Sequence, residues 1–418
     1  MDVPIDKLLK DCSLVFEWQS PARCAAIALV ASLFWVFIWA RQKWGDIRPE
    51  KRQTSAPPTV AELFQMAGPV LCAMTVGLSL LGALHFSQVL RPFGRLPLID
   101  ATTKWPQPLG FLSQMPPEGH VADFGARALW ASSAGLVIVG SIAVMWVVSG
   151  VWVSSSTNAR RLAFGAALIF ALAAAGVYIT AAFSGEANVD HASTLPNILL
   201  CVTETRATLP FLTIGVDFLG VLGTSAAVLA TMAGCMLAYP AHVGSDEEIA
   251  AQNLSRRWTL LGRVLFTSTV LLMAGILEVV ALYSWTTAPY PSTADVKTRT
   301  EVCKNLAGPA GAATQCKDAV TDAARASVVD DAKHVVNSLA LTMGSAFGLL
   351  LASIYLPAAF VLQDARANLF KTAKHEARTK ALEEHGLDDS FAKQWGVVAA
   401  GLGPLLVGLV SAALNVKL

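Results

Sequence analysis

Two acidic side chains within otherwise apolar stretches are the residues of this sequence whose placement most readily suggests chemistry. Glu278 lies in "VLLMAGILEVVALYSW" (270–285), and Asp217 lies in "PFLTIGVDFLGVLG" (210–223). An ionised carboxylate deep in a bilayer costs about 2.5–3.5 kcal/mol on insertion scales, so such groups face the interior of a helix bundle or a wet cavity. Both acids are therefore candidates for an ion or proton pathway.

The positions of the two acids along their helices predict that they share one level in the membrane. If the two helices run antiparallel, each acid lies roughly two turns from the outer end of its helix. His85, near the outer end of another apolar stretch, is at a similar level and is a third candidate. Two carboxylates in contact would titrate as a coupled pair, which suits proton handling. Alternatively, a single acid near a helix end reaches the interface or hydrogen-bonds a neighbouring helix.

Small and weakly polar residues follow each acid at helical spacing. From Asp217 the stripe runs through Gly220, Thr224, Ala227, Thr231 and Cys235, and from Glu278 it runs through Gly275, Leu271 and Ser268. Thr224 and Ser268 are therefore further pathway candidates, although such stripes are also common as packing seams between membrane helices. A third set with a four-residue repeat favours a helix-packing or oligomer seam; its members are Gly344, Gly348 and Ala352.

The composition favours a membrane protein. Hydrophobic residues make up 54% of the 418 residues and charged residues only 15%, whereas a soluble domain carries about 25% charged residues. The net charge of +1 gives no reason to expect nucleic acid as a partner. A span needs roughly 20 apolar residues. The stretches that qualify are 24–40, 66–90, 128–152, 162–184, 211–239, 261–285, 337–362 and 395–416.

These stretches predict an all-α fold: a polytopic integral membrane bundle of about eight transmembrane helices, with the lipid bilayer as its first partner. We divide the chain into an amphipathic N-terminal segment on the outer face (1–23), spans 1–6 (24–285), an extracytoplasmic helical hairpin loop (286–336), and spans 7 and 8 (337–418) with a cytoplasmic helical loop (363–394).

The density of basic residues gives the expected orientation. The stretch "RQKWGDIRPEKR" (41–52) follows the first span, and cytoplasmic loops are enriched in Lys and Arg close to the spans. That loop is therefore expected in the cytoplasm, both termini on the extracytoplasmic side, and the protein in a bacterial inner membrane. Trp39, Trp130 and Trp285 fall near span ends, as residues of an interfacial aromatic belt do.

Two cysteines flank a turn in the long outer loop. Cys303 and Cys316 lie on either side of Gly-Pro-Ala-Gly (308–311), with helix-forming sequence beyond each. A helical hairpin would bring the two thiols together, and a disulfide persists in an oxidising compartment. We therefore expect a disulfide that staples the hairpin; the alternative is two unrelated free thiols. Whether Cys12 and Cys201 pair stays open.

No motif in the sequence is diagnostic of an enzyme. It has no Walker motif, no GxGxxG, no nucleophile elbow and no Cys/His spacing typical of zinc, so no cofactor and no metal are expected. The favoured hypothesis is an oligomeric ion channel or pore, in one form a gated stress or defence effector. The alternatives are a non-catalytic anchor or subunit of a membrane complex, and a proton- or cation-coupled transporter that uses Asp217 and Glu278. A transporter would predict an internal repeat, which is not visible.

Overall fold

The computed structural model describes residues 19–44, 119–165, 203, 212–239, 247–292, 295–298, 301, 317–372 and 403. Its long elements are the α-helices α2 (Gln19–Trp44), α6 (His120–Ser154), α9 (Leu212–Ala238), α10 (Glu247–Thr287) and α12 (Lys317–Thr372). No strand occurs within these ranges. The prediction of an all-helical fold is therefore confirmed for the described part of the chain.

Three of these helices are long and apolar enough to cross a bilayer. They are α6 over its whole length, α9 over Ile214–Ala238 and α10 over Ile249–Thr287. They contain the expected spans 128–152 and 261–285 and nearly all of 211–239. α2 and α12 contain two further expected spans, 24–40 and 337–362. The expected spans 66–90, 162–184 and 395–416 lie wholly or mostly outside the described residues.

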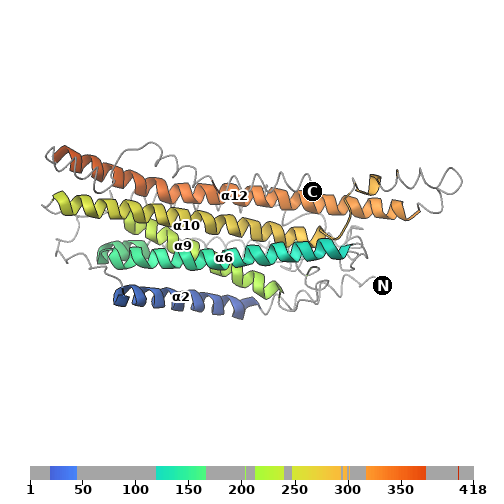
Figure 1. Cartoon of the computed structure of the whole chain (residues 1–418), viewed down its shortest axis with the longest axis horizontal. Helices are drawn as coiled ribbons and strands as arrows, with labels where there is room; N and C mark the ends of the chain where they lie inside the picture. The colour runs from blue at the N-terminus through green and yellow to red at the C-terminus, as the bar shows by residue number, and fades with distance from the viewer. Residues whose placement is uncertain are drawn as a thin grey trace, which may run out of the picture.

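The helices lie side by side with their long axes roughly aligned (Figure 1). α10 packs between α6 and α12 and also touches α9, while α2 packs on α6 and α9. α6 and α10 run in opposite directions, because Asp123 near the start of α6 bonds Trp285 near the end of α10. We call that end of the bundle the acidic end, for Asp123 and Glu278, and the opposite end the arginine end, for Arg41, Arg160 and Arg257.

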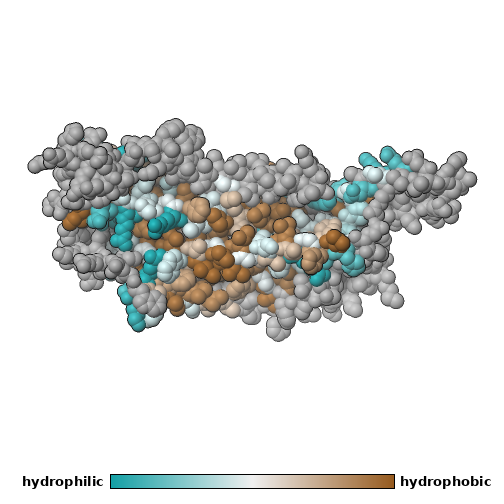
Figure 2. Space-filling view, in the orientation of Figure 1, coloured by the Kyte–Doolittle hydropathy of each residue, from teal (hydrophilic) through white to brown (hydrophobic). Residues whose placement is uncertain are grey.

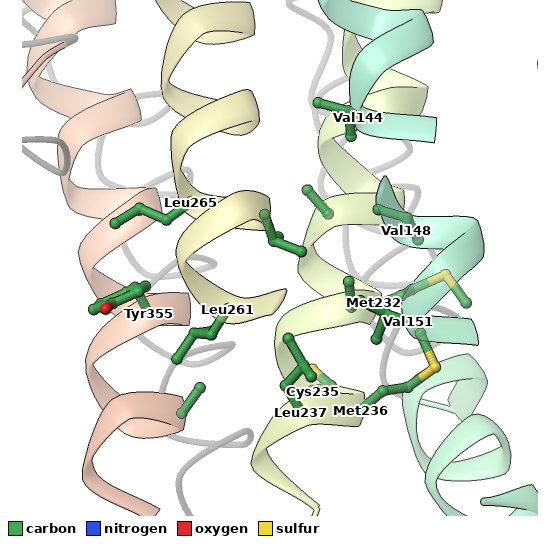
Figure 3. Packing of buried hydrophobic residues seen from close by; sticks show 14 of the residues in the cluster. Val144, Val148, Val151, Met232, Cys235, Met236, Leu237, Leu261, Leu265 and Tyr355 are labelled. Carbon is green, nitrogen blue, oxygen red and sulfur yellow. The ribbon is translucent and has the colours of Figure 1, made fainter. Parts of the chain in front are cut away.

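The core between the helices is built from apolar side chains at helical spacing. Val144, Val148 and Val151 share one face of α6 and are at most 1% exposed. Figure 3 shows them directed toward α9, with α10 and α12 on the far side of α9. The α9, α10 and α12 residues labelled there are Met232, Cys235, Met236, Leu237, Leu261, Leu265 and Tyr355. Cys235 is thus a buried packing residue with a free thiol.

Many large apolar side chains also point away from the bundle. Trp35, Phe266 and Phe360 are each 65% exposed, and they come from three different helices. Figure 2 shows hydrophobic residues over the middle of the visible face and hydrophilic residues gathered toward its two ends. An apolar surface of this kind needs a lipid or protein covering. This distribution is that of an integral membrane protein.

Arginines satisfy the helix carbonyls at the arginine end. The Arg160 Nε donates to the Trp152 carbonyl oxygen at 2.8 Å, and its Nη2 donates to that of Val153 at 3.1 Å. Arg257 of α10 donates in the same way to the carbonyl oxygen of Tyr239, just beyond α9. The last carbonyls of a helix lack intrahelical donors and carry partial negative charge. Cationic donors therefore complete the ends of both α6 and α9.

Two features extend the expected architecture. α12 joins the second arm of the expected outer hairpin, the expected span 337–362 and the start of the loop 363–394 into one helix. Gly403, from the expected last span, lies against α10: a Cβ at this residue would meet Thr269 Cγ2 at 2.8 Å and Met273 Sδ at 3.2 Å. Gly403 therefore packs on the face of α10 that carries these two residues.

Candidate functional site at the acidic end

Glu278, the acid first singled out in the sequence, is bound to a tryptophan of the neighbouring helix. It is 6% exposed, and its Oε1 accepts a hydrogen bond from the Trp130 Nε1 at 3.0 Å. Trp130 comes from α6 and Glu278 from α10. A buried carboxylate needs hydrogen-bond donors, and the indole N–H is a donor with no acceptor function. Glu278 is therefore part of the contact between these two helices.

A second buried acid, Asp123 of α6, makes the reciprocal contact. It is 4% exposed, and its Oδ1 accepts a hydrogen bond from the Trp285 Nε1 of α10 at 2.8 Å. Its Oδ2 accepts from the Arg127 Nε at 2.7 Å, one helical turn along α6. The Arg127 guanidinium carbon also lies 5.6 Å from the centroid of the Trp285 ring. The charge of Asp123 is thus paired with a cation.

The two contacts form one symmetric arrangement. In "DFGARALW" (123–130) and "EVVALYSW" (278–285) an acid precedes a tryptophan by seven residues, which is about two helical turns. Because the helices are antiparallel, the acid of each meets the tryptophan of the other. The Trp130 and Trp285 rings lie between the two contacts, with centroids 5.9 Å apart. We call Asp123, Trp130, Glu278 and Trp285 the carboxylate–indole lock.

Asp217 lies on α9 beside this lock. It is half-buried, and its neighbour Val216 packs with Leu212 against Leu282 and Trp285 of α10. The acidic ends of α9 and α10 are therefore level, as expected from their antiparallel course. The hydrogen bond described for Glu278 goes to Trp130, and contact between Asp217 and Glu278 stays a prediction.

The stripe that follows Asp217 along α9 changes from exposed to buried. Gly220 and Thr224 are exposed, and a Cβ at Gly220 would meet nothing within 4 Å. Thr231 is half-buried and donates its hydroxyl to the Ala227 carbonyl oxygen at 3.0 Å. Cys235 is buried in the core. The part of the stripe nearer the acidic end therefore forms a small, weakly polar surface on the outside of the described bundle.

Ser268, on the stripe from Glu278, lines a small, partly open cavity. The cavity lies among α9, α10 and α12, has a volume of about 30 Å³ and is otherwise almost wholly apolar; Leu261, Leu265 and Tyr355, which help to line it, are seen in Figure 3. Ser268 is 4% exposed, and its hydroxyl has no hydrogen-bond partner in the structure. A space of this size has room for about two water molecules. It is not a channel through the bundle.

The structure describes some of the remaining predicted site residues and not others. Gly344 is buried in α12, and Gly348 and Ala352 are half-buried on the same helix, as packing residues would be. His85, Cys303 and Cys316 lie outside the described residues. Within the described ranges, no three His, Cys, Asp or Glu side chains are grouped so that they could hold a metal ion.

Sequence reasoning singled out Glu278 and placed Trp130 and Trp285 near span ends, but it missed Asp123. This acid precedes the expected span 128–152, so its position resembled that of a loop residue. The signal that could have found it is the seven-residue spacing of acid and tryptophan, which recurs in two segments expected to be antiparallel. A recurrence of this kind becomes informative only when both segments are compared.

Comparison with known proteins found no similar protein. No family model, no curated protein and no solved structure matches this chain. Over the residues that the structure describes, the protein is a helical bundle with three helices able to span a membrane and a carboxylate–indole lock at one end.

Proposed function

We propose that this protein assembles in the membrane as an oligomeric ion-conducting pore and that the ion pathway runs between copies along α9. The observation that carries the proposal is the exposure of Gly220 and Thr224 within a helix apolar enough to span a bilayer. In lipid, a threonine hydroxyl and the close approach that glycine permits favour contact with another helix or with water. A ring of copies would give this surface such surroundings.

The described part of a single copy supports this arrangement. The cavity beside Ser268 is about 30 Å³, and its lining is almost wholly apolar. The buried acids of the lock are already engaged by Trp130 and Trp285. An ion pathway between copies would not require Asp123 or Glu278 to give up its hydrogen bond to tryptophan. Asp217, at the acidic end of the exposed stripe, is then the group that attracts cations, because a carboxylate at a pore mouth raises the local cation concentration.

The proposal includes the full architecture expected from the sequence: about eight spans, with both termini outside, in a bacterial inner membrane. The acidic end then faces outward and the arginine end faces the cytoplasm. Arg41, Arg160 and Arg257 gather at one end of the bundle, and this supports the orientation by the preference of basic residues for the cytoplasmic side.

The proposal also includes the disulfide between Cys303 and Cys316 in the outer hairpin. Closing so short a loop stabilises the folded chain by about 3 kcal/mol, chiefly by restricting the unfolded state. Mass spectrometry of peptides from protein purified without reductant should find the two cysteines linked. Recovery of both cysteines as free thiols would rule out the disulfide and would weaken the argument for the proposed orientation.

Ion flux through the purified protein in liposomes tests the function. The parent protein should pass small cations, and Asp217→Asn should reduce cation flux more than flux of a small anion, because the charge at the mouth is lost. Asp295→Asn, at an exposed acid outside the stripe, is the matched control and should conduct like the parent. Absence of flux through the parent protein in all lipid mixtures would overturn the proposal.

A second candidate function is a non-catalytic anchor or subunit of a larger membrane complex. The observation in its favour is the carboxylate–indole lock, which ties α6 to α10 through two hydrogen bonds between buried carboxylates and indole N–H groups. Such a contact favours a rigid scaffold over a moving gate. Purification from native membranes in mild detergent separates the two functions: an anchor copurifies with a different polypeptide in fixed ratio, whereas the pore purifies as copies of one chain.

A further inference from the structure

Two arginines at the arginine end repel each other electrostatically. Arg41 is near the end of α2 and Arg263 is on α10, and they are near enough for their charges to repel. Neither guanidinium forms an ion pair with a carboxylate anywhere in the described part of the chain. Like charges near a low-dielectric environment repel more strongly than in water. This pair would be stabilised by an anion.

Arg41 is held in a defined position. Its guanidinium carbon lies 4.1 Å from the centroid of the Trp146 ring, a cation–π distance. Its Nη2 donates a long hydrogen bond of 3.4 Å to the Trp146 carbonyl oxygen. It packs on Gly150, where a Cβ would meet the guanidinium carbon at 3.5 Å. Its Nε is buried and has no hydrogen-bond partner. The guanidinium is therefore held against α6 by Trp146 and Gly150.

The pair lies at the depth of a membrane–water interface. Gly140 of α6 packs against Leu271 of α10, so the antiparallel course places Trp146 roughly level with Arg263, about two turns before the end of the apolar segment of α6. Trp39 is 54% exposed and Trp146 is 44% exposed, as expected for residues of an aromatic belt. The Lys43 Nζ lies 5.0 Å from the centroid of the Trp39 ring and adds a third cation to this edge of the bundle.

We infer that Arg41 and Arg263, with Lys43 beside them, bind the phosphate of an anionic phospholipid headgroup. A guanidinium presents paired N–H donors that match two phosphate oxygens. Basic pockets between membrane helices on the cytoplasmic side are suited to such headgroups. The exposed indoles of Trp39 and Trp146 would lie beside the glycerol region of the same lipid. The inference rests on the proposed orientation but not on the pore, since an anchor in the same orientation would bind the lipid equally well.

Native mass spectrometry of the full chain in neutral detergent tests the lipid site. Phosphatidylglycerol should be retained at lower concentrations than phosphatidylcholine, which has the same phosphate but no net charge. Arg41→Gln with Arg263→Gln should weaken phosphatidylglycerol retention about 30-fold, or about fivefold for each arginine. The matched control is Arg161→Gln with Arg256→Gln, which removes two exposed arginines near the same end; retention should change much less than in the Arg41 and Arg263 pair.

Three outcomes would overturn the inference. In the first, the parent protein retains both lipids equally, a comparison that needs no variant and so stands even if the double variant fails to fold. In the second, the control pair loses as much retention as the Arg41 and Arg263 pair, so that general surface charge is responsible. In the third, inorganic phosphate at millimolar concentration displaces phosphatidylglycerol, so that the site is one for free phosphate.

Discussion

At the scale of single residues, the acid in an apolar helix has a partner that accounts for its burial. Glu278 receives the indole N–H of Trp130, and Asp123 receives that of Trp285 together with the guanidinium of Arg127. Hydrogen bonds to a charged group contribute about 1.5–3 kcal/mol, and an orphaned buried charge costs more than the bond was worth. The two contacts therefore fix both the pairing and the register of α6 and α10.

Replacing Trp130 tests the lock. Trp130→Phe keeps an aromatic ring but removes the donor, so Glu278 is left buried without it. We expect the free energy of unfolding to fall by about 1–3 kcal/mol, measured as denaturant-induced unfolding in detergent micelles. Trp35→Phe is the matched control: Trp35 is 65% exposed on α2, and its replacement should leave stability unchanged.

A double variant separates the lost hydrogen bond from lost ring volume. When Glu278→Leu accompanies Trp130→Phe, no carboxylate is left without a donor, because replacing both partners by apolar groups is nearly neutral. The double variant should therefore be more stable than Trp130→Phe alone. If it is less stable, the indole contributes through packing and the hydrogen bond is not what stabilises this contact.

At the scale of helices, α6 and α10 approach closely at Gly140. A Cβ there would lie 3.3 Å from the Cα of Leu271, whereas a Cβ at Gly135 of the same helix would meet nothing within 4 Å. Gly140 lies between the carboxylate–indole lock and the arginine end. The small residue thus lets the two backbones pack closely along the middle of the contact, where van der Waals packing drives association of membrane helices.

The glycine pair gives a prediction with an internal control. Gly140→Leu should push α6 and α10 apart and lower stability by about 1–3 kcal/mol, the usual cost of overpacking. Gly135→Leu adds the same side chain to an exposed position and should have little effect. Thermal unfolding of both variants in one detergent measures the difference. Equal midpoints for the two variants would show that close approach at Gly140 is not required.

Helix positions could be predicted from the sequence more fully than helix ends and contacts. The expected span 211–239 coincides closely with α9 because polar sequence bounds the apolar run on both sides. α10 begins at Glu247, well before the expected 261, because Arg256 and Arg257 interrupt hydropathy without interrupting the helix. The bond from Trp130 to Glu278 could not be predicted, since it depends on which helices are neighbours and on their register. The hydropathy of a sequence shows neither which helices are neighbours nor their register.

At the scale of the whole molecule, hydrophobic residues cover the middle of the visible face and hydrophilic residues gather toward its two ends (Figure 2). The acids at one end are hydrogen-bonded to indoles, and arginines at the other end complete the helix ends. Such polarity matches a bilayer whose cytoplasmic side favours basic residues. The proposed orientation is testable, because the loops at the two ends of the bundle are expected on opposite sides of the membrane.

Labelling of intact cells should establish the orientation. In a chain whose native cysteines are replaced by alanine, Lys297→Cys should react with a membrane-impermeant maleimide from outside. Lys51→Cys should react only after the membrane is permeabilised, since it follows the expected first span. Labelling of the cysteine at position 51 in sealed cells, without labelling at 297, would invert the orientation.

The pore between copies is tested most directly by the chemical reactivity of position 224. In the cysteine-free chain, Thr224→Cys in liposomes should react with a charged methanethiosulfonate reagent, and cation flux should fall as it reacts, because the side chain lines water. Phe266→Cys replaces an exposed side chain of α10 that we expect to face lipid, so it should stay unmodified and conduct normally. If the cysteine at position 224 stays unmodified while the protein conducts, the α9 stripe faces lipid or another helix, and the proposed pathway is wrong.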